Sequence, residues 1–236
     1  MQLTGKSEDY FSSFEGSINN MDDLQDVAKS SKDMHLLQSS HVFNVLVEYW
    51  RGNYEAAEDS SRRALMILPA SKMPTIFLIY HIFFRGLVLF QMYRTCGDDQ
   101  RLKDGKKAMD EMGVWAQNSM HVFENKFLLL KAECYSSIGD SDEALQMYEG
   151  SIKSSLDHGN IHELALAQNL LGNYHLERGY GTAAKECLKK AHLYYTQWGA
   201  TAVAENMVQK YKSIIDPFGR QESHVQNKKH SRQWDS

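Results

Sequence analysis

The sequence is poor in cysteine and proline, and both shortages restrict the class of protein. Only three cysteines occur among 236 residues, far apart and without a CxxC pair, and Cys96, Cys134 and Cys187 are each interpreted as small core residues. We therefore expect no disulfide framework and no structural zinc, and a reducing compartment such as the cytoplasm. Prolines are also only three, whereas Ala, Leu, Glu, Lys, Gln and Met, which favour helix, are plentiful. No run of alternating apolar and polar residues suggests a strand, so the sequence predicts an all-α protein.

An excess of one charge and a recognisable catalytic motif are lacking too. The formal net charge of −4 gives no general attraction to nucleic acid or anionic lipid, so neither partner is expected. No GxSxG or HExxH motif occurs. The stretch "TGKS" at residues 4–7 has no upstream glycine or strand for a phosphate-binding loop. His158 and His162 have a metal-ligand spacing but no evident third ligand, so they are interpreted as a loop pair. No catalytic residue, cofactor or metal site is therefore predicted.

One long apolar stretch, "TIFLIYHIFFRGLVLFQMY" at residues 75–93, approaches the length of a membrane span. It carries His81 and Arg85 near its middle, and charged residues are rare inside spans. The favoured interpretation is therefore a buried core helix, with a membrane-associated helical protein as an alternative.

Four glycines divide the chain at intervals of 45, 42 and 40 residues: Gly52, Gly97, Gly139 and Gly179. An apolar-periodic segment lies on each side of every one of these glycines. Glycine readily adopts the left-handed conformation that ends a helix. The side-chain oxygens of the residues that follow, Asn53, Asp140 or Ser141, and Thr182, could cap the next helix. The pattern predicts a helix, a tight turn and a second helix, repeated about every forty residues.

Small residues recur at fixed offsets within these units. Alanine stands five residues after three of the glycines, at Ala57, Ala144 and Ala184, where it would let two paired helices approach closely. Alanine or serine stands twelve residues after the same glycines. The unit around Gly97 departs from the pattern, because Leu102 and Met109 occupy the equivalent positions.

The stretch "GNYEAAEDSSRRALMILP" and the pair Leu171-Gly172 resemble the tetratricopeptide repeat. This resemblance implies a right-handed α-α superhelix of about four helical hairpins. The segment "TAVAENMVQKYKSII" has one apolar stripe, as a C-terminal capping helix needs. The predicted organisation is a mobile segment at 1–20, a repeat domain at 21–216 and a disordered tail at 217–236.

A more specific resemblance covers roughly residues 39–211. The segments "FENKFLLLKAE", "GDSDEALQMYEGSI", "HELALAQNLLGNYHLERG" and "YYTQWGA" look like the helical-repeat region of large signalling proteins. Those proteins join a serine/threonine-kinase-like domain, an AAA-type ATPase, the repeats, and often GAF and histidine-kinase domains. The resemblance implies a repeat scaffold and carries over no catalytic residue.

The concave face of such a superhelix, lined by the first helix of each hairpin, is where this family holds peptides or partner helices. The sequence therefore predicts a non-enzymatic interaction scaffold for a protein or peptide partner, either alone or within a signalling ATPase. An enzyme with a site between hairpins is the alternative, which a cleft containing strongly perturbed pKa values would favour. The predicted partner-binding residues are Gln91, Arg94, Lys126, Glu133, Asn169, Asn173 and Glu177.

Overall fold

A computed structural model describes residues 21–67 and 75–215, and this part of the chain is all helix and short turns, with no strand. The all-α prediction is confirmed. The "TGKS" stretch, the predicted mobile segment 1–20 and the predicted tail 217–236 lie outside the described residues. The helices are α2 (Met21–Ser30), α3 (Met34–Arg51), α4 (Tyr54–Ile67), α5 (Thr75–Cys96), α6 (Asp99–Asn118), α7 (Met120–Ile138), α8 (Ser141–Asp157), α9 (Ile161–Glu177), α10 (Gly181–Trp198), α11 (Thr201–Lys210) and α12 (Lys212–Ile215).

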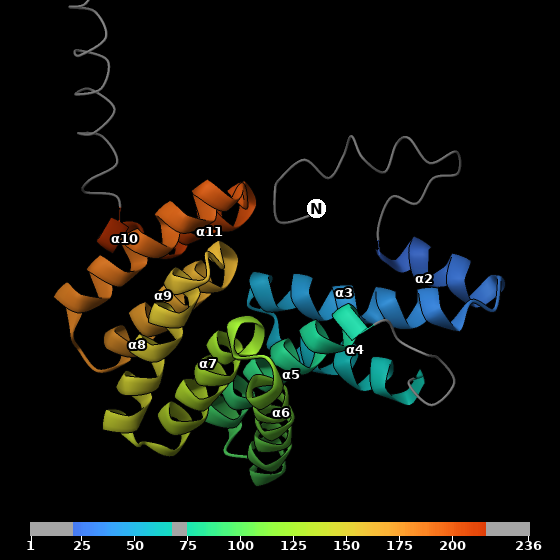
Figure 1. The fold of residues 1–236 in the computed structure, drawn as a ribbon. Helices are drawn as coiled ribbons and strands as arrows, with labels where there is room; N and C mark the ends of the chain where they lie inside the picture. Colours follow the sequence, from blue (N-terminus) through green and yellow to red (C-terminus); the bar gives the residue numbers. More distant parts are fainter. Residues whose placement is uncertain (1–20, 68–74, 216–236) are drawn as a thin grey trace, which may run out of the picture.

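The long helices form four consecutive hairpins: α3 with α4, α5 with α6, α7 with α8, and α9 with α10 (Figure 1). The first helix of each hairpin also packs on the first helix of the next, from α3 to α5, α7 and α9. Each second helix packs on the first helix that follows it. The hairpins therefore stack in chain order, and α11 and α12 pack on α10 at the end of the stack.

The predicted hairpin turns are confirmed at all four glycines. Gly52, Gly97, Gly139 and Gly179 all have positive φ, between 68° and 83°. The predicted caps are only partly right. The Asp140 carboxylate does accept from the backbone N–H of Glu143, but Thr182 lies inside α10, whose cap position is Tyr180.

The small residues at fixed offsets are buried where the helices approach each other. Ala57, Ala144 and Ala184 are 0% exposed. The hairpin around Gly97, which lacks the alanine, has its close helix contact at Gly105 instead. A Cβ on Gly105 would lie 2.8 Å from the Phe90 ring. In that hairpin the close contact is therefore displaced toward the middle of α6, which accounts for the missing alanine.

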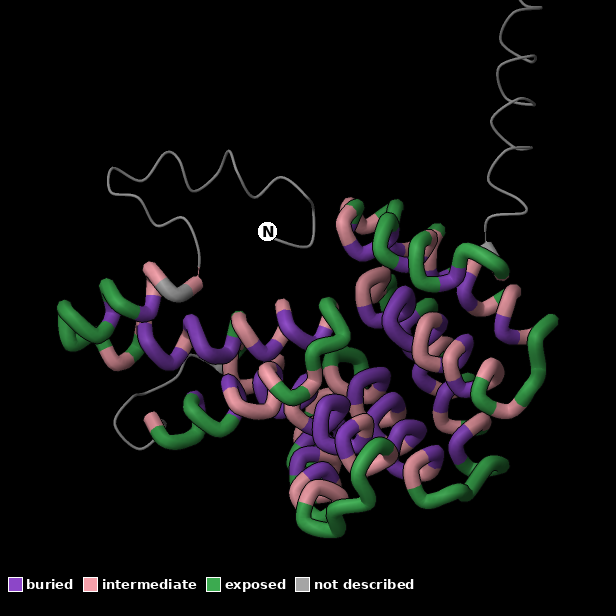
Figure 2. The backbone as a smooth tube through the Cα atoms, turned by 180° about the vertical axis from the view of Figure 1, so that it is seen from behind, coloured by how far each residue is buried: buried purple, intermediate pink, exposed green. Residues whose placement is uncertain are grey.

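The long apolar stretch forms α5, the only helix in the described ranges that is long and apolar enough to cross a membrane. Over half of its apolar window, 56%, is buried inside the protein. Phe83, Leu87 and Phe90 are almost fully buried in the main core, and Figure 2 shows the burial concentrated in the middle of the hairpin stack. His81 is buried as well and is 2.9 Å from the Ser61 hydroxyl.

The two ends of the stack are built differently. At the N-terminal end the helical segment is broken between α2 and α3, where Lys32 has a φ of 56°. At the other end the predicted apolar stripe is confirmed, since Val203, Met207 and Tyr211 are buried in a second core cluster.

The stack curls so far that its first and last hairpins touch. The ring of Trp50, at the end of α3, lies 5.3 Å from that of Tyr195 on α10, edge to face. Trp50 also packs against the second core cluster, which is otherwise formed by α9 to α12. The described helices therefore enclose a central space between the two ends.

Candidate partner-binding groove

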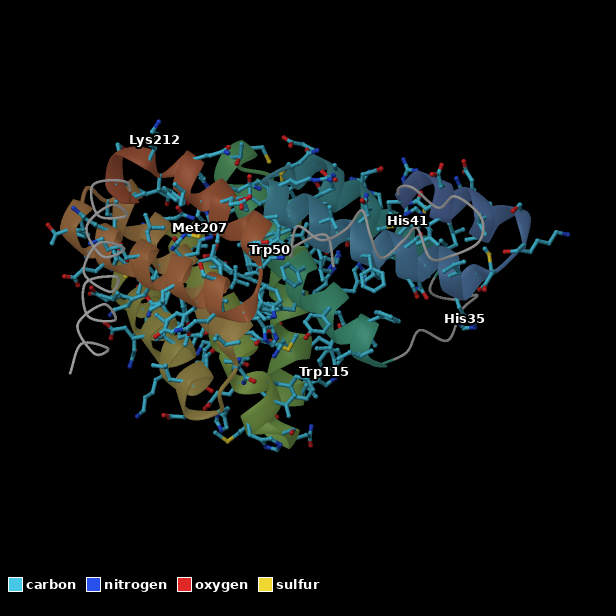
Figure 3. The ribbon with its side chains drawn as sticks, turned by 90° about the horizontal axis from the view of Figure 1, so that it is seen from above. His35, His41, Trp50, Trp115, Met207 and Lys212 are labelled. Atoms are coloured by element: carbon cyan, nitrogen blue, oxygen red, sulfur yellow. The ribbon has the colours of Figure 1, made fainter. Side chains whose placement is uncertain are left out.

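Two joined cavities, of about 490 and 340 Å³, lie inside the curl. They are treated below as one feature, the polar groove, because they share the lining residues Tyr54, Leu170, Asn173, Lys210 and Tyr211. The walls come from α3, α5, α7 and α9, which are the first helices of all four hairpins, and from α11. In Figure 3, which looks down on the molecule, the groove residues Trp50 and Met207 lie near the centre.

An ion pair forms the floor of the smaller cavity. The Arg94 guanidinium donates to Glu133 Oε2 at 2.7 Å, and the Tyr148 hydroxyl donates to Glu133 Oε1 at 2.5 Å. Arg94 also donates to Gln91 and to the Ser137 hydroxyl. The Glu133 side chain is only 3% exposed, so three helices, α5, α7 and α8, are tied together around one buried carboxylate.

Two members of this cluster, Arg94 and Tyr148, keep fixed protonation states near neutral pH. Burial raises the pKa of Tyr148 well above its ordinary value, and the Glu133 charge adds to the shift. Burial alone would lower the pKa of Arg94, but the Glu133 carboxylate outweighs it, and the pKa is raised. General acid–base catalysis needs a pKa close to the working pH. Perturbed pKa values in a cleft would favour an enzyme. The pKa values of Arg94 and Tyr148 move away from neutrality, however, so these two groups suit binding better than proton transfer.

The larger cavity presents side-chain amides. Asn169 and Asn173 stand one turn apart on α9 and line it together. The Oδ1 atom of Asn173 accepts from the Tyr211 hydroxyl, which leaves the amide N–H groups to donate elsewhere. Asn169 Oδ1 is buried without a hydrogen bond. Lys210 extends over the Tyr211 ring, 5.0 Å from its centre, so the groove has an ammonium group beside the two amide side chains.

Six of the seven predicted partner-binding residues line the polar groove. Gln91, Arg94, Glu133 and Glu177 line the smaller cavity, Asn169 the larger, and Asn173 both.

The seventh, Lys126, lines neither of these two cavities. Its ammonium is buried near the start of α7 and lies 2.6 Å from Glu163 of α9. Lys126 and Glu133 share a face of α7, but they are two turns apart. The Lys126 turn faces the start of α9 and pairs with it, whereas the Glu133 turn faces Arg94 of α5 and Tyr148 of α8.

Sequence reasoning missed several groove residues, namely Tyr54, Tyr148, Lys210 and Tyr211. Tyr148 and Tyr211 were assigned to apolar packing, and their rings are indeed buried. Their hydroxyls nevertheless reach polar partners, as a buried tyrosine usually requires. A signal existed, because Glu133 and Asn173 are polar residues on buried helices and each needed a donor from a neighbouring helix.

The other candidate groups are placed as follows. His158 follows the end of α8 with Nδ1 2.8 Å from the Ser154 carbonyl oxygen, whereas His162 is in α9 and contacts Glu163 rather than lying in a loop. Across residues 21–67 and 75–215, no three His, Cys, Asp or Glu side chains are grouped so as to hold a metal ion. Cys134 is buried, but Cys96 is exposed, so its interpretation as a core residue is wrong.

The sequence matches no protein-family model, and it matches no curated protein.

Proposed function

We propose that this chain is a non-enzymatic scaffold of the tetratricopeptide type, a right-handed superhelix that binds a peptide or partner helix in the polar groove. The observation that carries the proposal is that the first helices of all four hairpins contribute polar side chains to this one groove. Repeat proteins bind partners on such a surface because each unit adds one row of contacts.

The groove is suited to a polypeptide by its chemistry and its size. The combined space is larger than the volume of about 300 Å³ at which ligand sites begin. Asn169 and Asn173 could both bond one partner backbone, since an amide offers a donor and an acceptor. Following the sequence resemblance, we further propose that the partner belongs to a cytoplasmic signalling ATPase or kinase assembly.

The experiment is a quantitative pull-down with the full chain as bait. The variant Asn169→Ala with Asn173→Ala is expected to lose most of a specific partner set. A matched variant, Glu186→Ala with Lys190→Ala, changes the exposed face of α10 and should keep it. Asn173 both accepts a hydrogen bond from Tyr211 and is proposed to bind the partner. Tyr211→Phe removes the hydrogen bond between these two residues and leaves the Asn173 amide in place, so it tests the first role alone. Retention of every partner by the Asn169/Asn173 variant would count against the groove.

A further inference from the structure

A second cavity, of about 250 Å³, lies between the first and last hairpins. We call it the aromatic cavity, because five aromatic side chains line it. They are Trp50, Tyr80, Phe83, Phe84 and Trp198, and the remaining lining residues are Leu46, His162, Glu163 and Leu166. Trp50 lines both this cavity and the polar groove, so the two spaces meet at the contact between the first and last hairpins.

One polar group in this apolar lining is a buried carboxylate. Glu163 is 3% exposed, and its Oε1 atom is 2.6 Å from the Lys126 ammonium. Its Oε2 atom is 2.7 Å from His162 Nε2. Burial opposes ionisation, yet His162 and Lys126 outweigh it and lower the pKa of Glu163. The cavity wall therefore contains an ionised carboxylate with Lys126 beside one oxygen and His162 beside the other.

The lining selects among ligands by charge. Aromatic rings present a negative face that attracts an ammonium group within about 6 Å. The Glu163 carboxylate lines the cavity, whereas the Lys126 ammonium does not, so the charge nearest to the ligand is negative. Lys126 is held on Glu163 Oε1 and on the Val122 carbonyl at 3.2 Å. It balances the charge of Glu163 without occupying the space.

The volume limits the ligand to a small one. It lies below the range of about 300–1,000 Å³ that drug-sized ligands occupy, so it suits one side chain or one small amine. We propose that the aromatic cavity is a binding site for an alkylammonium group, such as a quaternary ammonium ion or a methylated lysine side chain. Trp50 and Trp198 hold its methyl groups, and the Glu163 carboxylate in the wall balances its charge. This site is separate from the proposed polypeptide contacts of the polar groove.

The experiment is isothermal titration calorimetry of the full chain with choline and with its neutral analogue, in which carbon replaces the nitrogen. The two compounds have nearly the same shape, so any difference reports the charge. Choline is expected to bind at least about tenfold more tightly, a difference of about 1.4 kcal/mol. Equal binding of the two compounds would overturn the proposal.

Variants then locate the site. Glu163→Gln keeps the shape and is expected to weaken choline binding about tenfold while leaving the analogue unchanged, because it removes the negative charge in the cavity wall. Since this change leaves Lys126 without its counter-ion, Trp198→Leu, which retains the ion pair, is the second variant and should also weaken binding. Trp115→Leu is the control, because Trp115 lies on α6 against Phe123, away from the cavity (Figure 3). Choline binding that survives both site variants in folded protein would refute the site.

A peptide containing one trimethylated lysine, tested beside the same peptide with unmodified lysine, separates the two sources of such a group. Tighter binding of the trimethylated peptide than of choline assigns the cavity to a partner's side chain. Tighter binding of choline assigns it to a free small molecule. Binding of neither would reject the inference, while the pull-down through the polar groove would stand on its own result.

Discussion

The ion pair between Arg94 and Glu133 should be strongly coupled in its contribution to stability. Their contact is 2.7 Å, and the two side chains are 18% and 3% exposed. Removing one partner of such a buried pair leaves the other charge poorly solvated, which costs roughly 3–5 kcal/mol. Because Arg94 keeps some access to water, the lower end of this range applies, about 3 kcal/mol for each of Arg94→Met and Glu133→Leu.

The double variant leaves no unpaired charge, so it should lose less than either single variant, well below the sum of about 6 kcal/mol. Urea unfolding followed by far-UV circular dichroism measures all three free energies of unfolding. The pair Arg85 and Asp104 is the matched control, with a longer contact of 3.9 Å and side chains 21% and 26% exposed. Its cycle should show a coupling of at most about 1 kcal/mol. If the losses of Arg94→Met and Glu133→Leu simply added, the argument from burial would be wrong.

Three further predictions concern stability. The pKa of buried His81 is lowered to about 4 by burial and by the nearby Arg85 charge, so only the unfolded chain gains its proton as pH falls from the ordinary value of 6.5. Stability should therefore drop by about 3 kcal/mol between pH 7 and 4, and His81→Gln should lose much of this dependence in pH-resolved urea titrations. Gly172→Ala would bring a methyl group to 2.7 Å from Leu188, so thermal unfolding should show a loss of about 1–3 kcal/mol. Gly139→Ala should cost about 1 kcal/mol by the same assay, since φ is +83° there.

Matched controls exist for the glycine predictions. Gly181 opens α10 and has no heavy atom within 4 Å of an added Cβ, and its φ is not in the left-handed region. Gly181→Ala should therefore be neutral or slightly stabilising. A loss as large as that of Gly172→Ala would mean that neither the contact with Leu188 nor the backbone angle is the cause.

The hairpin units could be predicted from sequence because their signals are local. A positive φ favours glycine at a helix end whatever lies beyond the turn, so Gly52, Gly139 and Gly179 were sufficient. The alanines five residues later were informative for a similar reason, since two helices joined by a tight turn must approach each other.

The candidate groove was only partly predictable, because its walls depend on how far the stack curls. Periodicity correctly placed Asn169 and Asn173 on one face of α9, but it could not distinguish Lys126 from Glu133 on α7. That distinction depends on where α9 lies, because Glu163 of α9 pairs with the Lys126 ammonium. Lys210 and Tyr211 follow from the return of α11 across the groove, a contact between segments far apart in sequence. The aromatic cavity has the same origin, since Trp50 and Trp198 meet only when the two ends come together.

The contact between Trp50 and Tyr195 has a consequence for how the chain could vary. In an open array of repeats, each unit depends on its neighbours alone, so units can be added or deleted with a predictable change in stability. Here the first and last of the described hairpins also contact each other, through Trp50 and Tyr195. Inserting a fifth hairpin would separate these two rings, and deleting the first would uncover the last. The contact between the two rings therefore constrains the number of hairpins that can lie between them.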